Sequence, residues 1–244
     1  MRNLRLLIEY DGTGYAGFQR QPRQPTIQGE LERALGRLLG EAVRVVGAGR
    51  TDAGVHATGQ VAHLLARGAI PAERVAGAVN RLLPRQIVVR RAEEAPLAFH
   101  ARRDAVARRY RYTVFNRPGP SAILGRFGLV AAEPLDAAAM EEAAQALVGE
   151  HDFRSFQKSG SETRSTVRRL IELRCRRIGS VVVIAIEANA FLYQMARIMV
   201  GALLRVGRGE LTGRDLWRLL ALADRRQAGP AAPAHGLCLV RVRY

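Results

Sequence analysis

The sequence has 244 residues, enough for one large domain or two small ones, and a chain of this length buries roughly 70–75% of its unfolded surface. With 48% hydrophobic and 25% charged residues and no apolar run of membrane-spanning length, we expect a soluble, cytoplasmic protein without a signal peptide or membrane segment. The formal net charge of +16, carried almost entirely by arginine, favours a nucleic-acid partner.

The first half of the chain predicts the element order βαββαβ. Apolar residues alternate with polar ones over 4–10, as in a strand with one buried face. Thr26 is positioned to cap a helix that ends near Gly40. The apolar residues of that helix recur at helical spacing: Ile27, Leu31, Leu35 and Leu38. Strands are expected at 4–10, 43–47, 60–65 and 86–93, and helices at 26–40 and 71–83.

The second half repeats this alternation. Strands are expected at 108–116, 167–177, 180–187 and 237–244, and helices at 135–148, 191–206 and 216–226. We therefore predict an α+β fold of two topologically similar ferredoxin-like (βαββαβ) halves with antiparallel sheets and a cleft between them. The predicted domains are residues 1–104 and residues 105–244.

A glycine-rich stretch, GAGRTDAGVH at 47–56, lies between two predicted strands. Glycines allow a tight turn and a close approach to a ligand, and loops held by a rigid scaffold often carry function. Arg50 and Asp52 are two positions apart and point the same way in an extended segment. From this pattern alone, a functional loop and a β-turn with a surface ion pair are equally good interpretations.

The predicted helix that contains Arg197 is apolar almost all round, so we expect it to be buried. An arginine at such a place needs an anion, because an unpaired buried charge is costly. One interpretation is a snorkelling side chain at the helix surface. The sharper interpretation pairs Arg197 with Asp52, which would keep the carboxylate ionised and fixed in place.

Cations and aromatic residues alternate in RRYRYTVF at 108–115. Tyr110 and Tyr112 share one face of the predicted strand. The residues of the other face are Arg109, Arg111 and Thr113. Such a strand can stack a base while its arginines hold phosphate. A strand with one packed aromatic face is the simpler alternative.

No cofactor or metal is expected. The stretch GTGYAG at 12–17 fits GxGxxG, but the next helix begins only at Thr26, after two prolines, whereas a dinucleotide-binding loop opens directly into a helix. Cys175, Cys238 and the five histidines show no metal-ligand spacing.

The chain resembles the tRNA pseudouridine synthase A family in several short segments that are spread over nearly its whole length. The similar segments, in chain order, are YDGTGYAGFQRQ at 10–21, GRTDAGVH at 49–56, FHAR at 99–102, RYRY at 109–112, FLYQMAR at 191–197 and AAPAHG at 231–236. Their order makes the match far more specific than any one motif.

The resemblance implies roles for individual residues. Asp52 takes the place of the catalytic aspartate, as nucleophile or base, and Arg50 that of its motif neighbour. Arg197 takes the place of the arginine that pairs with this carboxylate, and Tyr110 that of the active-site tyrosine. The further substrate-binding candidates are Arg102, Arg109, Arg111 and His56.

The resemblance also implies a cofactor-free, homodimeric isomerase that converts uridine to pseudouridine at positions 38, 39 and 40 of the tRNA anticodon arm. The chain departs from the family pattern at Arg103 and Asp104, where a serine is common, and at Ile198, where an asparagine is usual. These departures concern RNA contacts or packing and leave the carboxylate unchanged.

Two chemical routes remain open at Asp52. The carboxylate attacks the anomeric carbon to form a covalent intermediate, or it takes a proton from the neighbouring ribose carbon to give a glycal. The alternative function is a non-catalytic RNA-binding protein of two RRM-like units, but the RNP1 pattern is missing, and Asp52 and Arg197 would then have no purpose. A metal-dependent nuclease is excluded by the lack of clustered acids and histidines.

Overall fold

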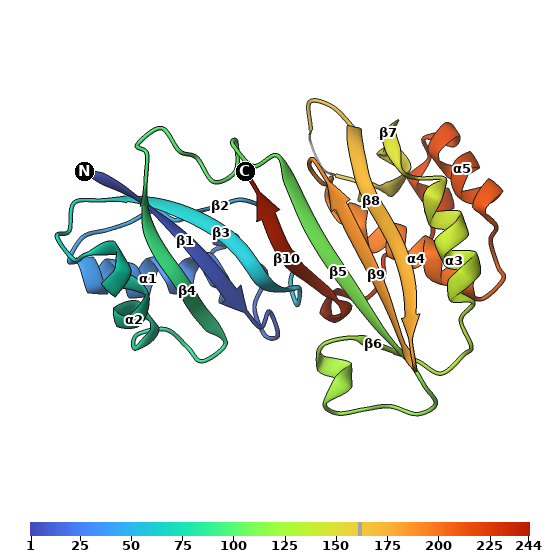
Figure 1. The fold of residues 1–244 in the computed structure, drawn as a ribbon, viewed down its shortest axis with the longest axis horizontal. Coiled ribbons are helices and arrows are strands. Elements are labelled where there is room, and N and C mark those ends of the chain that lie inside the picture. The colour runs from blue at the N-terminus through green and yellow to red at the C-terminus, as the bar shows by residue number, and fades with distance from the viewer. Residues whose placement is uncertain (161–162) are drawn as a thin grey trace. The chain divides into compact units, whose positions relative to one another are not determined.

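Two compact units make up the structure, a computed structural model that describes residues 1–160 and 163–244 (Figure 1). Unit 1 comprises Met1–Val106 together with Cys238–Tyr244, and unit 2 comprises Ala107–Leu237. Both units contain helices and strands, so the predicted mixture of α and β structure is confirmed. The sequence assigned 105–244 to one domain, whereas the end of the chain groups with unit 1.

Unit 1 is built on a sheet with the strand order β4-β1-β3-β10, and β2 pairs with β3 in addition. The elements are β1 (Arg2–Tyr10), α1 (Ile27–Leu39), β2 (Val46–Gly47), β3 (His56–Ala66), α2 (Ala72–Asn80), β4 (Ile87–Ala95) and β10 (Leu237–Arg243). β1 lies antiparallel to both β3 and β4, whereas β10 runs parallel to β3.

Burial explains why β1 and α1 form where they do. The alternate side chains of β1 are buried, as predicted: Leu4, Leu6, Ile8 and Tyr10. Thr26 caps α1 by accepting a hydrogen bond from the Gly29 amide, and Gly40 ends the helix with a left-handed φ of 69°. Three residues of the predicted stripe are buried: Ile27, Leu31 and Leu35. Leu38 is only half-buried, and Ala34 is buried in addition.

The largest differences between the observed and the predicted strands of unit 1 are at the starts of β2 and β3. β2 contains only Val46 and Gly47 rather than 43–47, and β3 begins at His56 rather than at residue 60. The first residues of β3 lie opposite β10 and the end of β1. Pairing with strands from distant parts of the chain therefore extends β3 beyond its local apolar pattern.

Unit 2 is built on a sheet with the order β5-β9-β8-β7, and β6 lies parallel to β5. Its strands are β5 (Ala107–Asn116), β6 (Leu129–Ala131), β7 (Gly149–Asp152), β8 (Val167–Ile178) and β9 (Val181–Ala188). Its α-helices are α3 (Ala137–Gln145), α4 (Met195–Gly207) and α5 (Gly213–Leu222). Four short 3-10 turns complete the described part of this unit: η1 (Leu124–Arg126), η2 (Arg154–Phe156), η3 (Arg225–Ala228) and η4 (Ala234–Gly236).

The helices α3, α4 and α5 gather on one side of the unit 2 sheet (Figure 1), and β5 alternates accordingly. Tyr110 and Tyr112 are buried, whereas Arg109 is half-buried and Arg111 is exposed. The predicted separation of an aromatic face from a cationic face of this strand is confirmed.

The elements of unit 2 differ from the prediction at three places. α4 begins at Met195 rather than at 191, because Gln194 has a left-handed φ of 59° and the preceding residues form a turn. α5 covers 213–222 rather than 216–226, with Thr212 and Asp215 forming a capping box at its start. β6 and β7 were not predicted, since neither short segment has an alternating apolar pattern.

Candidate active site

The segment that carries Asp52 is the loop 48–55 between β2 and β3, here called the aspartate loop. Its backbone carbonyls are held by donors from outside the loop. The Gln60 side chain donates to the Gly49 carbonyl at 2.9 Å, and the Phe18 amide donates to the Thr51 carbonyl at 3.0 Å. Asp52 therefore follows directly after a backbone carbonyl that is fixed to another segment.

A buried tyrosine holds the side chain of Thr51. The Tyr10 hydroxyl lies 2.8 Å from Thr51 Oγ1, and the Gln60 amide donates to the same hydroxyl at 3.4 Å. Burial raises the pKa of Tyr10 above its ordinary value, more than its hydrogen bonds lower it, so this hydroxyl stays protonated at neutral pH. These buried contacts attach Thr51 of the aspartate loop to β1 and β3.

Two glycines let another loop approach the aspartate loop closely. A Cβ added to Gly12 would lie 2.1 Å from the Val55 carbonyl oxygen, and one added to Gly17 would lie 2.6 Å from the Thr51 carbonyl oxygen. Gly17 also has a φ of +96°, which side chains rarely adopt. The segment 10–21, here called the opening segment, and the aspartate loop thus pack backbone against backbone, which explains Gly12 and Gly17.

Asp52 is half-buried and Arg50 is exposed at the surface of this loop. Burial, and then the positive charge of Arg102, lower the pKa of Arg50, although an arginine remains charged at neutral pH. Arg102, the other predicted site arginine of unit 1, is exposed as well.

His56, the first residue of β3 after the aspartate loop, contacts the segment that follows β1. Its side chain is 7% exposed, its Nδ1 accepts a hydrogen bond from the Gly12 amide at 3.0 Å, and the same nitrogen lies 3.1 Å from Asp11 Oδ1. These contacts anchor the start of β3 to the opening segment. The predicted contact of His56 with substrate remains a prediction.

In unit 2, Arg197 lies half-buried in the first turns of α4. Its Nε donates to the Ala232 carbonyl at 2.8 Å, and the Ala232 amide donates to the Arg197 carbonyl at 2.9 Å. The Tyr112 hydroxyl donates to the neighbouring Pro233 carbonyl at 3.0 Å. The segment AAPAHG at 231–236 therefore fixes the direction of the Arg197 side chain.

Tyr110 lies on β5. The centroids of its ring and of the Phe191 ring are 5.0 Å apart, and the two rings meet edge to face. Its neighbour Arg109, on the opposite face of the strand, lies 2.9 Å from Glu172 and 3.9 Å from Glu187. Arg111 on that face is exposed. Of the two predicted phosphate-binding arginines on β5, Arg111 is thus the more accessible.

The predicted site residues divide between the units. Asp52, Arg50, Arg102 and His56 belong to unit 1, and Tyr110, Arg109, Arg111 and Arg197 belong to unit 2. The predicted pairing of Asp52 with Arg197 would join the two units and remains a prediction. Sequence reasoning missed Tyr10 and Gln60, although Tyr10 opens the first block of the family resemblance and Gln60 is a polar residue inside a strand.

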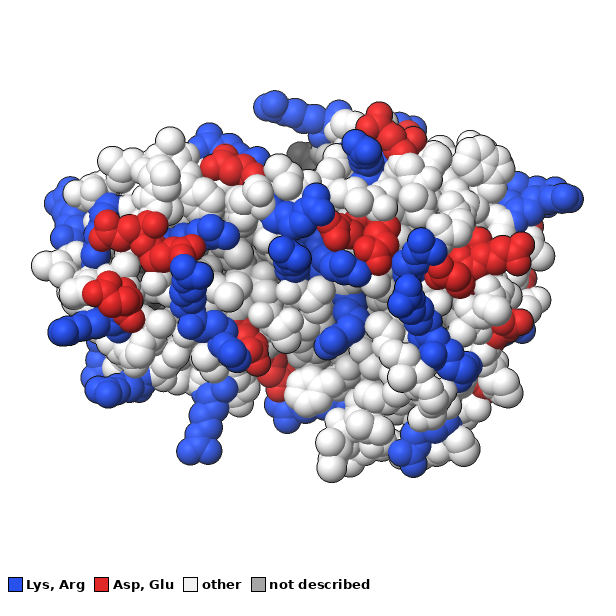
Figure 2. Space-filling view, in the orientation of Figure 1, with Lys and Arg blue, Asp and Glu red and all other residues white. Residues whose placement is uncertain are grey.

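Charges of both signs occur on the surface, with arginine and lysine in excess (Figure 2). Over residues 1–160 and 163–244, no group of three possible metal ligands occurs. Within the same ranges, none of the helices combines the length and the hydrophobicity that crossing a bilayer requires.

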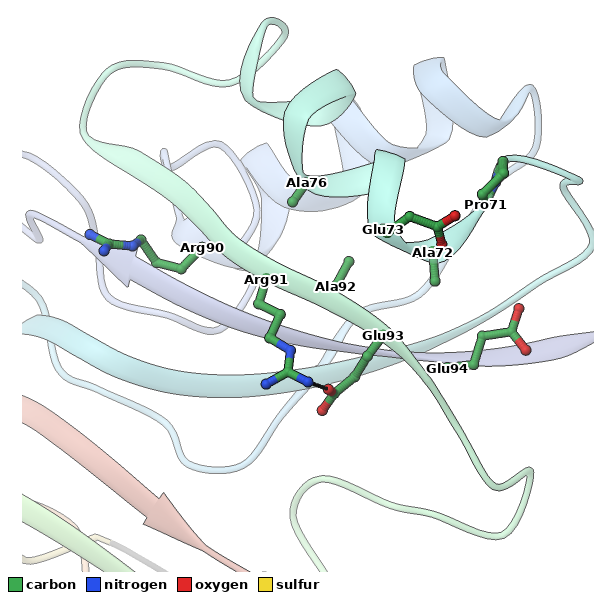
Figure 3. Close-up of a pocket in the computed structure, with 9 residues that line it drawn as sticks. All are labelled: Pro71, Ala72, Glu73, Ala76, Arg90, Arg91, Ala92, Glu93 and Glu94. Carbon is green, nitrogen blue, oxygen red and sulfur yellow. Dashed lines mark ion pairs between the residues drawn. The ribbon is translucent and has the colours of Figure 1, made fainter.

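A separate cavity of about 640 Å³ lies in unit 1 between α2 and β4 (Figure 3). Its lining residues are Pro71, Ala72, Glu73, Ala76, Arg90, Arg91, Ala92, Glu93 and Glu94. Arg91 and Glu93 form an ion pair at 2.6 Å across its rim, so part of the charge there is internally compensated. The aspartate loop contributes nothing to this cavity, and it is not the predicted site.

Comparison with known proteins identifies the family to which the chain belongs. A family model described as tRNA pseudouridine synthase matches residues 6–104 and 143–244. The chain therefore belongs to the tRNA pseudouridine synthase family, a family of isomerases, as the sequence blocks predicted.

Within that family the chain is similar to proteins named tRNA pseudouridine synthase A. It is 42% identical to the one from Acetivibrio thermocellus and 44% identical to the one from Brevibacillus brevis, each over 244 residues and 100% of both chains. It is 48% identical to the one from Rhodospirillum rubrum over 246 residues, which cover 100% of this chain and 88% of the relative.

Proposed function

We propose that this protein isomerises uridine to pseudouridine in the anticodon stem-loop of tRNA, at positions 38, 39 and 40, with Asp52 as the essential carboxylate. The observation that carries the proposal is the aspartate loop. The backbone before Asp52 is fixed by Phe18 and Gln60, and Gly12 and Gly17 pack directly against the backbone of the loop. A carboxylate held in this way is preorganised to meet one reacting atom.

The reaction needs no redox partner, because atoms and electrons balance within the nucleotide. The bond from the ribose carbon to N1 breaks, a bond from the same carbon to C5 forms, and the proton of C5 is lost while N1 gains one. Asp52 either attacks the anomeric carbon or removes a proton from the neighbouring ribose carbon. We therefore propose a cofactor-free reaction by one of these two routes.

The other site residues have proposed roles that the family resemblance implies. Arg197 would pair with the Asp52 carboxylate and keep it ionised, and Tyr110 would stack on uracil or assist loss of the C5 proton. Arg50 would act beside Asp52 once the target base has left its stack. The residues proposed to bind RNA are Arg102, Arg109, Arg111 and His56.

We also propose that the protein is a cytoplasmic homodimer. The element order of unit 1, β1-α1-β2-β3-α2-β4, supports the further proposal that the two units are ferredoxin-like halves of one duplicated fold. Light scattering after size-exclusion chromatography tests the dimer, since a monomer would elute with a mass near 26.8 kDa.

The test of the function is tritium release from a tRNA transcript labelled at C5 of uridine. We expect release by the wild type and none above background by Asp52→Asn, which keeps the size of the side chain but removes its charge. Binding of tRNA by the variant should stay within about threefold of the wild type. Release by Asp52→Asn at a substantial rate would refute the role of the carboxylate. Tight binding without release by either protein would favour the RNA-binding alternative.

A further inference from the structure

A histidine side chain closes the loop 99–104, FHARRD, here called the arginine loop. His100 Nδ1 lies 3.2 Å from the backbone nitrogens of both Arg102 and Arg103 and accepts hydrogen bonds from them. Asp104 closes the loop from its other end, because its carboxylate accepts the His100 amide at 2.8 Å. The side chains of Arg102 and Arg103 are exposed. A fixed backbone thus presents two arginines to solvent.

A second histidine connects the arginine loop to the strand that precedes the aspartate loop. His63 lies in β3, and its Nδ1 accepts a hydrogen bond from the Ala101 amide at 3.1 Å. Val46 lies directly opposite His63 in the pairing of β2 with β3. Val46 belongs to β2, which ends directly before the aspartate loop. The His63 and His100 rings are 4.8 Å apart between centroids.

The arginine loop carries two exposed positive charges, those of Arg102 and Arg103. Guanidinium groups match the oxygens of a phosphate in geometry and charge, and RNA carries one phosphate per nucleotide.

We propose that His63 and His100 are positioning residues: as neutral acceptors they shape the arginine loop so that Arg102 binds an RNA backbone phosphate. The proposal rests on the proposed function for the identity of the RNA. It goes beyond that function because it gives a role to two histidines that the proposed reaction does not use, and because both act through Arg102.

The proposal makes RNA binding depend on pH, since both Nδ1 atoms must be unprotonated to accept an amide. The charged and titratable groups around the pair are Arg103 and Asp104 of the arginine loop, and Arg5 of β1, which pairs with Glu93 of β4. Burial, and then the neighbouring His100, lower the pKa of His63 from its ordinary value of 6.5. Nδ1 of His63 is therefore unprotonated above about pH 6.5. Its hydrogen bond to the Ala101 amide is lost as the pH falls through the lowered pKa.

The experiment compares KM and kcat for a tRNA transcript between pH 5.5 and 8 in the wild type, His100→Asn and His100→Leu. Asparagine places Oδ1 at the same number of bonds from Cα as histidine Nδ1 and never protonates. We expect H100N to keep the KM of the wild type at pH 7.5, because its amide oxygen accepts the same two backbone hydrogen bonds. We expect the KM of the wild type to rise as the pH falls through the lowered pKa of His63. We expect H100L to raise KM about tenfold, with kcat within about threefold, since two backbone hydrogen bonds are lost.

A double-mutant cycle shows whether the histidine acts through the arginine. Arg102→Ala should raise KM about as much as H100L, and the variant with both changes should behave like R102A alone. Additive effects of the two changes would overturn the proposal, as would a KM of H100N at pH 7.5 as high as that of H100L. His151→Leu in unit 2 is the control, and a rise of its KM equal to that of H100L would also overturn the assignment.

Direct binding separates failure of this inference from failure of the proposed function. If the wild type releases no tritium, the proposed function fails, and the same variants are compared by filter binding of the tRNA transcript. A Kd that rises in H100L and R102A, but not in H100N at pH 7.5, would still support the positioning role. An unchanged Kd in H100L, with thermal unfolding showing a folded protein, would refute it.

Discussion

At the scale of single residues, Gly17 packs directly against the backbone that precedes Asp52. Gly17 has a φ of +96°, and a Cβ there would lie 2.6 Å from the Thr51 carbonyl oxygen, which must then move. Gly14 has a similar φ of +80° but open space around it. Both glycines therefore share the cost of a side chain at positive φ, and only Gly17 adds a collision.

We expect Gly17→Ala to lower the free energy of unfolding by about 1–3 kcal/mol more than Gly14→Ala. We also expect a fall in kcat of about 100-fold, since a shift of roughly 1 Å at a reacting group has this effect. Urea unfolding and tritium release measure the two quantities. Equal behaviour of the two variants would show that the contact at Gly17 does not position the loop.

The two cysteines are expected to differ in reactivity. Burial, and then the nearby Glu141, raise the pKa of the Cys175 thiol to about 12, so only about one thiol in ten thousand is ionised at pH 8. Cys238 is half-buried in β10. Iodoacetamide at pH 8 should therefore alkylate Cys238 first and Cys175 only after unfolding in guanidinium. Mass spectrometry of peptides reads this directly, and rapid labelling of Cys175 in the folded protein would contradict the burial.

At the scale of elements, the contact between α4 and the segment 230–236 fixes the position of Arg197. A Cβ added to Gly201 of α4 would lie 2.2 Å from the Pro230 carbonyl oxygen. Gly77 of α2 is exposed and has open space around it. Alanine is the better helix former at both positions, so the difference between the two substitutions reports packing alone.

We expect Gly201→Ala to lower the free energy of unfolding by about 1–3 kcal/mol, and Gly77→Ala to raise it by about 0.5–1 kcal/mol. The former should also lower kcat, because the Arg197–Ala232 hydrogen bonds depend on the same contact. Denaturant unfolding of both variants is the measurement. A stabilised Gly201→Ala would mean that the segment 230–236 moves away easily and does not hold Arg197.

The elements that could be predicted from the sequence are those with a local cause. The alternation of Leu4, Leu6 and Ile8 and the cap at Thr26 belong to short stretches of chain, and β1 and α1 formed there. The start of α4 was wrong because the left-handed φ of Gln194 depends on tertiary structure and not on its own preference. β7 and the parallel pairing of β10 depend on strands far away in sequence, so no local pattern predicts them.

The candidate site shows the same division. Asp52 and Arg50 stood out because glycines concentrate around them, and the structure holds that loop tightly. Their supports, Tyr10 and Gln60, act through single hydrogen bonds between distant segments. His63 and His100 looked like isolated histidines in the sequence, and only the fold brings their rings to 4.8 Å.

At the scale of the whole molecule, the net charge of +16 strengthens RNA binding in general. It does not determine which phosphate each arginine contacts. Each phosphate neutralised by an arginine releases counterions, so binding weakens as salt rises, with a slope that counts phosphate contacts. Removing any arginine reduces the general field by the same amount. Only an arginine that touches a phosphate should change the slope.

This difference can be measured with two variants of equal charge. Arg102→Ala and Arg74→Ala each remove one exposed cation from unit 1, the first from the arginine loop and the second from α2. We expect R102A to reduce the slope of log Kd against log salt concentration by about one, and R74A to leave it unchanged. Filter binding of a tRNA transcript between about 50 and 200 mM salt gives the slopes. Equal slopes for the two variants would mean that Arg102 contributes only to the general field, and the arginine loop would then have no specific part in holding RNA.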